Sequence, residues 1–384
     1  MINNARHPKA KAVASVSVLL AMILLAFAIQ RPVMLAAGAI ISAAYALFHY
    51  RSACISHTQL LLFLLISALF LPGIINSYHG LSPAFYYFST VASFYAAGAV
   101  TRHKPEVLMA AFRLVYWGLI VVISIILYEY WDYVEPLGMA ITGSSTNAIP
   151  SYLLVIQIGL SLCNFLVHGR LPVFSPIATG VIAFLGIGRG SIVIAALIIV
   201  VSLFFNLWLI GSISRKRQLI YFLILTSMVI PLVWNAEELI DFFLGLTKLS
   251  VGLVDENRLE ILREYWGKIE PWTFIFGADY DGTVIESVYL GNPHIAYIRT
   301  HSFFGLPLTI LAMISPIFVL LCRKVLIAKL VFACFIGLAA TRASTEPLFF
   351  PTLLDFFYFT YFFLFFRYAH SGSIARRGPE SVVN

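Results

Sequence analysis

The sequence predicts an all-α, polytopic integral membrane protein with about twelve transmembrane helices and one long external loop that contains amphipathic helices. Of the 384 residues, 60% are apolar and 11% are charged, whereas soluble domains average about 45–50% and about 25%. Apolar runs long enough to cross a hydrocarbon core of roughly 30 Å recur along the chain and are separated by polar breaks. A soluble surface cannot be built from this composition, so the chain is expected to lie in a bilayer.

Twelve apolar runs are predicted as membrane spans, the first of them retained and not cleaved as a signal peptide. Their approximate ranges are 12–30, 32–48, 59–76, 83–100, 108–128, 149–167, 171–187, 191–211, 218–234, 296–320, 325–341 and 347–366. They divide the chain into a membrane block at 1–234, an external loop at 235–295, and a second membrane block with a cytoplasmic tail at 296–384.

The twelve-span layout distributes the positive charges unequally between the two sides of the membrane. Most of the 25 Lys and Arg residues fall on the side that carries both termini, and most acidic residues fall on the other side. Cytoplasmic loops are enriched in Lys and Arg. Both termini are therefore predicted to be cytoplasmic, and the net charge of +7 reflects membrane orientation rather than binding to nucleic acid.

Two short external loops carry arginines against this rule. Arg189 lies in Gly186-Ile-Gly-Arg-Gly-Ser191, where backbone N–H groups and a guanidinium suit an anion; the alternative is a tight turn whose arginine reaches lipid phosphate. Arg342 precedes Glu346 in the loop at 341–347. These two residues form either a simple salt bridge or part of an anion site in which Glu346 orients a histidine or an acceptor hydroxyl.

The segment from Asp255 to Ile269 is predicted to be an amphipathic external helix. Its apolar residues recur at helical spacing, namely Leu259, Leu262, Trp266 and Ile269. Arg258 shares a face with Tyr265 that overlaps this stripe, so its side chain can point toward the membrane mouth. The alternative is a surface helix with charge pairing to Glu260 and Glu264.

His294 follows Asn292-Pro at the end of the long loop and is the leading candidate for a general base. Its alternative role is a helix cap or an interface residue. His301 is expected to be a packing or hydrogen-bonding histidine, and Arg299 lies between the two. Two histidines without a carboxylate at suitable spacing predict no metal site, and four scattered cysteines predict neither a disulfide framework nor a zinc site.

The order of these features resembles the O-antigen polymerase and ligase superfamily over residues 180–310. The motifs that carry the resemblance are Gly188-Arg-Gly190, Glu270-Pro271, Phe276-Gly-Ala-Asp279, Asn292-Pro-His294 and Phe304-Gly-Leu306. The resemblance implies a metal-independent membrane glycosyltransferase of the GT-C type, without cofactor, in the bacterial inner membrane. Its active site would face the periplasm and use an undecaprenyl diphosphate-linked oligosaccharide as donor.

The same resemblance implies roles for individual residues. Those that bind the donor would be Arg189, Arg258 and Arg342, with Arg299 as a weaker fourth and Tyr265 stacking on sugar. His294 would take the proton of the attacking hydroxyl, assisted by Glu346. We expect a polymerase, with a second lipid-linked unit as acceptor and a chain-length regulator protein as a further partner, because the His-Asn motif of the ligases reads His294-Ile295 here.

Two alternatives stay open from the sequence. A ligase would transfer the glycan to lipid A-core or to protein. A flippase or other transporter would also place arginines in a cavity for a diphosphate, although transporters usually gather polar groups near the bilayer midplane, whereas most charges of this chain lie at outer helix ends.

Overall fold

A computed structural model describes residues 6–49, 64, 67–76, 79–133, 136–139, 148–186, 188–209 and 256–369. All regular elements in these ranges are helical. They are α1 (Arg6–Ile29), α2 (Pro32–Phe48), α4 (Leu71–Asn76), α5 (Ser82–Val100), α6 (Pro105–Glu129), α7 (Pro136–Met139), α8 (Ala148–His168), α9 (Phe174–Leu185), α10 (Arg189–Phe204), the π-helical turn η2 (Phe205–Leu209), α13 (Glu256–Gly267), α14 (Pro271–Phe276), α15 (Val284–Ser287), α16 (Ala296–Leu321), α17 (Leu326–Ala343) and α18 (Asp355–Tyr368).

Six of the described helices are long and apolar enough to cross a membrane: α1, α6, α8, α10 with η2, α16 and α17. Helices α2 and α9 are apolar but shorter. The fold is thus all-helical, and its helix lengths are compatible with a multi-pass membrane protein. The number of twelve spans stays a prediction, because the third predicted span is described mainly at its C-terminal end and the ninth, at 218–234, lies outside the described residues.

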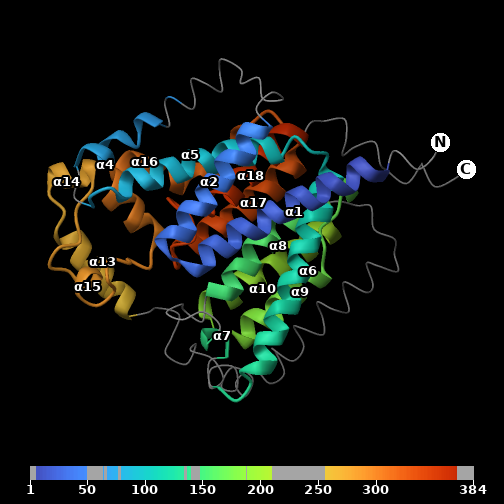
Figure 1. The fold of residues 1–384 in the computed structure, drawn as a ribbon, viewed down its shortest axis with the longest axis horizontal. Helices are drawn as coiled ribbons and strands as arrows, with labels where there is room; N and C mark the ends of the chain where they lie inside the picture. Colours follow the sequence, from blue (N-terminus) through green and yellow to red (C-terminus); the bar gives the residue numbers. More distant parts are fainter. Residues whose placement is uncertain are drawn as a thin grey trace, which may run out of the picture.

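Helix α8 is the centre of the bundle, with α6, α9, α17 and α18 packed around it (Figure 1). Small residues let these helices approach closely, as is common between membrane helices. A Cβ atom on Gly159 would lie 2.3 Å from the ring of Phe112, so the α6–α8 contact requires glycine at this position. The polar side chains near the start of α8 are consequently held in a rigid frame.

A small unit of α13, α14 and α15 packs against α16, where that helix is kinked. Gly305 has φ 77° inside α16, and a Cβ atom there would lie 2.1 Å from the carbonyl oxygen of Ile275. A Cβ atom on Gly277, which has φ 96°, would lie 2.3 Å from the carbonyl oxygen of His301. Only glycine permits both contacts, which fix the outer unit on the membrane bundle.

The apolar stripe predicted for α13 is wrong in part. Ile261 and Tyr265 are the residues buried against the unit's small core, whereas Leu259 and Trp266 are 38% and 47% exposed. The buried face is therefore rotated by a fraction of a turn relative to the predicted stripe, because α13 packs on α15 and shares a small core with the loop before α16.

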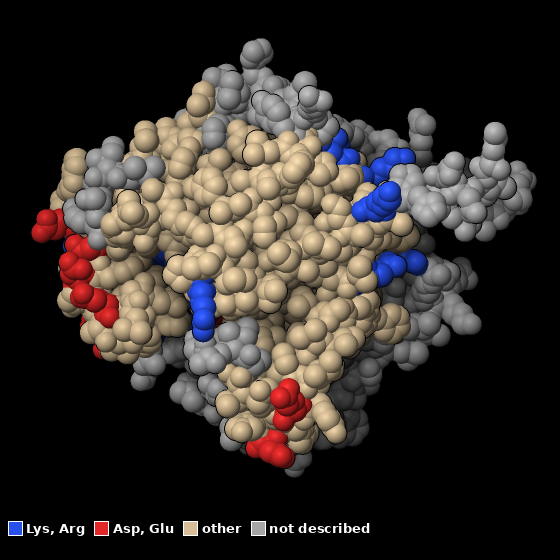
Figure 2. All heavy atoms as spheres, in the orientation of Figure 1, with Lys and Arg blue, Asp and Glu red and all other residues tan. Residues whose placement is uncertain are grey.

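On the face shown in Figure 2, most described Lys and Arg residues lie apart from the Asp and Glu residues. Figure 2 shows Lys and Arg gathered near the N-terminal end of α1, and Asp and Glu over the α13–α15 unit and near the bottom of the view. The central surface carries few charges. This distribution agrees with the charge separation read from the sequence, while the assignment of the two ends to the two sides of a membrane stays a prediction.

Candidate functional site

A buried arginine at the end of α17 is the centre of the candidate site. The Arg342 side chain is only 3% exposed, and serine hydroxyls from two other helices hold it. Its Nη2 donates to Ser151 Oγ at 2.8 Å and to Ser191 Oγ at 3.1 Å, and its Nη1 donates to Thr345 Oγ1. These acceptors are neutral, so they fix the guanidinium without cancelling its charge.

The start of α10 is shaped to receive this guanidinium. Gly190 lies against it, and a Cβ atom on Gly190 would be 2.8 Å from Nη1 of Arg342 and 3.2 Å from Oγ1 of Thr345. The next residue, Ser191, is fully buried and supplies one of the hydroxyl acceptors. The predicted Gly-rich turn therefore joins α9 to the first residues of α10, and its third glycine, Gly190, makes room for an arginine from α17.

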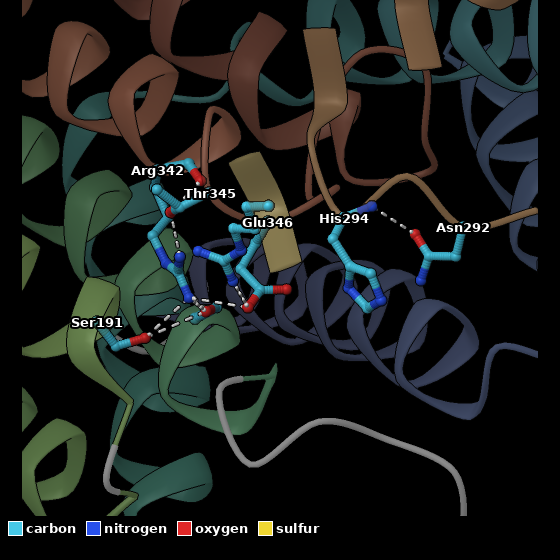
Figure 3. Close-up of polar contacts among 8 residues, drawn as sticks. Ser191, Asn292, His294, Arg342, Thr345 and Glu346 are labelled. Carbon is cyan, nitrogen blue, oxygen red and sulfur yellow. Dashed lines mark hydrogen bonds and ion pairs between the residues drawn. The ribbon is translucent and has the colours of Figure 1, made fainter. Parts of the chain in front are cut away.

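A carboxylate joins two arginines at this place. Glu346 Oε1 lies 3.6 Å from Nη2 of Arg342 and 3.5 Å from Nη2 of Arg258 on α13 (Figure 3). Both separations are longer than ordinary charge-assisted hydrogen bonds of about 2.7–2.9 Å. Two guanidinium groups face one carboxylate, which leaves a surplus of positive charge suited to an anion.

Arg189 is the first residue of α10, so its backbone lies beside the site, at a helix terminus that favours anions. Its side chain is outside the described part of the structure. The prediction that it binds a phosphate stays a prediction.

His294 lies at one side of the cluster. Its φ is 54°, a left-handed conformation that is uncommon for residues with a side chain and recurs at functional sites. Its backbone N–H donates to Oδ1 of Asn292 at 3.2 Å, and its ring packs edge-on against Tyr289. In Figure 3 the imidazole and Glu346 point toward the same region, without a dashed line between them.

Arg299 connects the two loops that carry these groups. Its Nη1 donates to the Pro347 carbonyl at 3.4 Å, next to Glu346, and its Nη2 donates to Asn292 Oδ1 at 3.5 Å, next to the histidine loop. Both bonds are long and the side chain is half-buried. The structure therefore shows a bridging contact for Arg299, and its predicted contact with the donor stays a prediction.

Tyr265 lies away from any surface that a sugar could reach. It is fully buried, and its hydroxyl is 2.8 Å from Nδ1 of His301. The other ring nitrogen of His301 is 2.8 Å from the carbonyl oxygen of Phe274. A carbonyl can only accept, so Nε2 carries the proton and Nδ1 accepts from Tyr265. Burial raises the pKa of Tyr265 well above its usual value, which keeps the hydroxyl a donor.

His301 is thus the hydrogen-bonding histidine that was expected. The predicted stacking of Tyr265 on a sugar does not fit its burial, because a ring without exposed area has no face to offer. We assign Tyr265 instead to holding α13, and hence Arg258, on α16.

Sequence reasoning missed the side chains that accept hydrogen bonds from Arg342 and Arg299, namely Ser151, Ser191 and Thr345 for Arg342 and Asn292 for Arg299. Ser191 is the last residue of the Gly-rich turn and Asn292 opens the His294 motif, so the sequence pattern marked both residues. Nothing in the sequence marked Ser151 as a partner of an arginine, because a single serine in an apolar helix is ordinary. Within the described ranges no three His, Cys, Asp or Glu side chains gather as a candidate metal site.

Comparisons of this chain with protein-family models, with curated proteins and with solved structures returned no match.

Proposed function

We propose that this protein is a glycosyltransferase that polymerises polyprenyl diphosphate-linked oligosaccharide units into a surface polysaccharide. The supporting observation is the pair of guanidinium groups of Arg258 and Arg342 around one displaceable carboxylate, Glu346. A diphosphate leaving group carries more negative charge than the carboxylate. The paired N–H groups of a guanidinium match the spacing of two oxygens on a phosphate, so each arginine can bind the diphosphate through two hydrogen bonds.

The proposed setting follows the charge distribution. Twelve spans would place both termini in the cytoplasm and the α13–α15 unit in the periplasm of a bacterial inner membrane. The donor's headgroup would then meet the arginine cluster at the outer interface. Acceptor and donor would both be undecaprenyl diphosphate-linked chains, with a chain-length regulator protein as a further partner.

The proposed reaction is a single displacement. A hydroxyl oxygen of the acceptor sugar attacks the anomeric carbon of the donor and forms the new glycosidic bond. The bond between that carbon and the diphosphate oxygen breaks, and its electron pair leaves with the diphosphate. Arg258 and Arg342 stabilise the charge that develops on this oxygen. The hydroxyl proton passes to His294, and the anomeric centre is inverted.

Glu346 has a specific part in this sequence. In the described state it occupies the position between the two arginines that the diphosphate would take. Binding of the donor would displace it, and the freed carboxylate would then face the acceptor hydroxyl or His294. Such a displacement of Glu346 would explain why a buried acid lies within a site proposed to bind an anion.

Purified protein in nanodiscs, supplied only with synthetic undecaprenyl diphosphate-linked oligosaccharide, tests the proposal. We expect the glycan to lengthen by whole repeat units, as measured by mass spectrometry. Transfer only to added lipid A-core would instead identify a ligase. Movement of the lipid between leaflets without a new glycosidic bond would identify a transporter and overturn the proposal.

The role of His294 has a separate test. His294→Asn is expected to lower the turnover number while leaving donor binding unchanged, because a base acts on the acceptor proton and not on the diphosphate. Full turnover of this variant would assign the proton transfer to another group.

A further inference from the structure

An apolar groove lies between α1, α6 and the start of α8, where these helices run side by side (Figure 1). Its volume is about 690 Å³, within the range of roughly 300–1,000 Å³ that is usual for small-molecule sites. Aliphatic side chains form nearly all of its wall, with Leu25 of α1 and Val122 of α6 among them. The groove has the apolar lining of a site for a hydrocarbon chain.

One end of the groove adjoins the arginine cluster. Tyr152 lines this end and is only 5% exposed. The preceding residue, Ser151, accepts hydrogen bonds from Arg342. An apolar channel and a cationic site therefore meet within one turn of α8.

A ligand that fits both parts has an anionic head and a long apolar chain. Tyr152 lies at this junction, since it lines the groove and directly follows Ser151, the partner of Arg342. Two guanidinium groups, from Arg258 and Arg342, match the two phosphates of a diphosphate better than the single phosphate of a glycerophospholipid.

We propose that this groove holds the isoprenoid chain of a polyprenyl diphosphate whose headgroup lies at Arg258 and Arg342. The proposal rests on the proposed function for the identity of the headgroup. It adds where the lipid chain runs, and it assigns Tyr152 as the residue between chain and headgroup.

Gly118 offers a way to fill the groove without disturbing the helices. It lies on the groove wall in α6, and a Cβ atom there would have no atom within 4 Å. Gly337 of α17 has the same free space but does not line the groove. Gly118→Trp and Gly337→Trp are therefore matched variants that add the same side chain inside and outside the proposed site.

Binding measurements with two probes separate the chain from the headgroup. We expect Gly118→Trp to weaken undecaprenyl diphosphate binding at least tenfold in native mass spectrometry and to leave inorganic pyrophosphate binding unchanged. Gly337→Trp should change neither. Wild-type affinity of Gly118→Trp for undecaprenyl diphosphate would overturn the proposal, as would an equal loss of pyrophosphate binding.

Phosphatidylglycerol, the third probe, tests whether the groove is an ordinary phospholipid site. Photoreactive undecaprenyl diphosphate, the fourth probe, tests the groove in the wild type if the variant does not fold. Phosphatidylglycerol retained by the wild type and lost from Gly118→Trp, with undecaprenyl diphosphate binding intact, would assign the groove to phospholipid and overturn the proposal. If Gly118→Trp does not fold, photoreactive undecaprenyl diphosphate should label α1 and α6 of the wild type, and labelling confined to other helices would contradict the groove. These readouts measure binding, so they stay informative even if no polymerisation occurs.

Discussion

Arg258 and Arg342 meet at one oxygen of Glu346, although they come from an amphipathic helix of the outer unit and from a helix of the membrane bundle. The two guanidinium groups share a single counter-charge. Arg342 is buried and immobilised by hydroxyls, while Arg258 is partly exposed. The position of Arg342 is thus fixed by the membrane bundle, whereas the position of Arg258 depends on how the unit of α13, α14 and α15 packs on α16.

Arg258→Ala is expected to weaken donor use about tenfold to a hundredfold, since a hydrogen bond to a charged group contributes about 1.5–3 kcal/mol. The measurement is kcat/KM for glycan lengthening. Arg263→Ala, on the exposed face of the same helix, is the matched control and should retain wild-type kinetics. Equal losses in both variants would indicate a general effect of charge rather than a contact of Arg258.

Glu346→Gln should have opposite effects on binding and turnover. Removing the carboxylate removes the internal competitor for the two arginines, so inorganic pyrophosphate should bind about tenfold tighter, which corresponds to about 1.4 kcal/mol. The turnover number should fall, because the amide cannot accept a proton. Weaker pyrophosphate binding would show that Glu346 only orders the arginines. Isothermal titration calorimetry and the polymerisation assay give the two readouts.

Gly190→Ala should displace the guanidinium of Arg342, because the new methyl group would lie 2.8 Å from Nη1. A displacement of this kind can lower turnover by up to about a hundredfold. Gly98→Ala on α5 is the control, since its Cβ atom would only reach ordinary contact with Phe363 at 3.7 Å. Normal turnover of Gly190→Ala would mean that Arg342 has room to move without loss of function.

Tyr265→Phe should destabilise the outer unit. The change leaves Nδ1 of His301 without its donor, and an unsatisfied buried acceptor costs about 1–3 kcal/mol. We expect a lower Tm in detergent together with faster hydrogen exchange in α13. The control is Tyr133→Phe, whose side chain is 52% exposed and whose loss of a hydroxyl should leave Tm unchanged.

The loop after α14 should weaken in acid. Although burial raises the pKa of Asp279, the hydrogen bond and charge of Lys268 outweigh this effect and lower it below the ordinary value of 3.8. A carboxyl group with a lowered pKa stabilises the fold above its ordinary value and loses that contribution as pH falls through the folded pKa. Hydrogen exchange around Asp281 should thus accelerate below pH 3.8, and Asp279→Asn should abolish this dependence.

The sequence determined where the helices lie. Long apolar runs cannot be hydrated, and within a bilayer the backbone must pair within its own segment, so most of the described runs become helices. The run predicted at 347–366 is wrong in its first part, because residues 347–354 form turns and bends and α18 begins only at Asp355. Local spacing also predicted the contact of Arg342 with Glu346 and placed Arg258 on a face that can meet the membrane bundle. These inferences need only the geometry of one segment.

The tertiary structure decided which helices supply partners to the site. Helical periodicity fixes which residues of one segment share a face, but it does not specify which face of another helix they meet. Ser151 could be recognised as a partner of Arg342 only once α8 and α17 were packed together. In the same way, the docking of α13 on α16 buried Tyr265 and exposed Trp266, because the energy of burial depends on the surface that the helix meets.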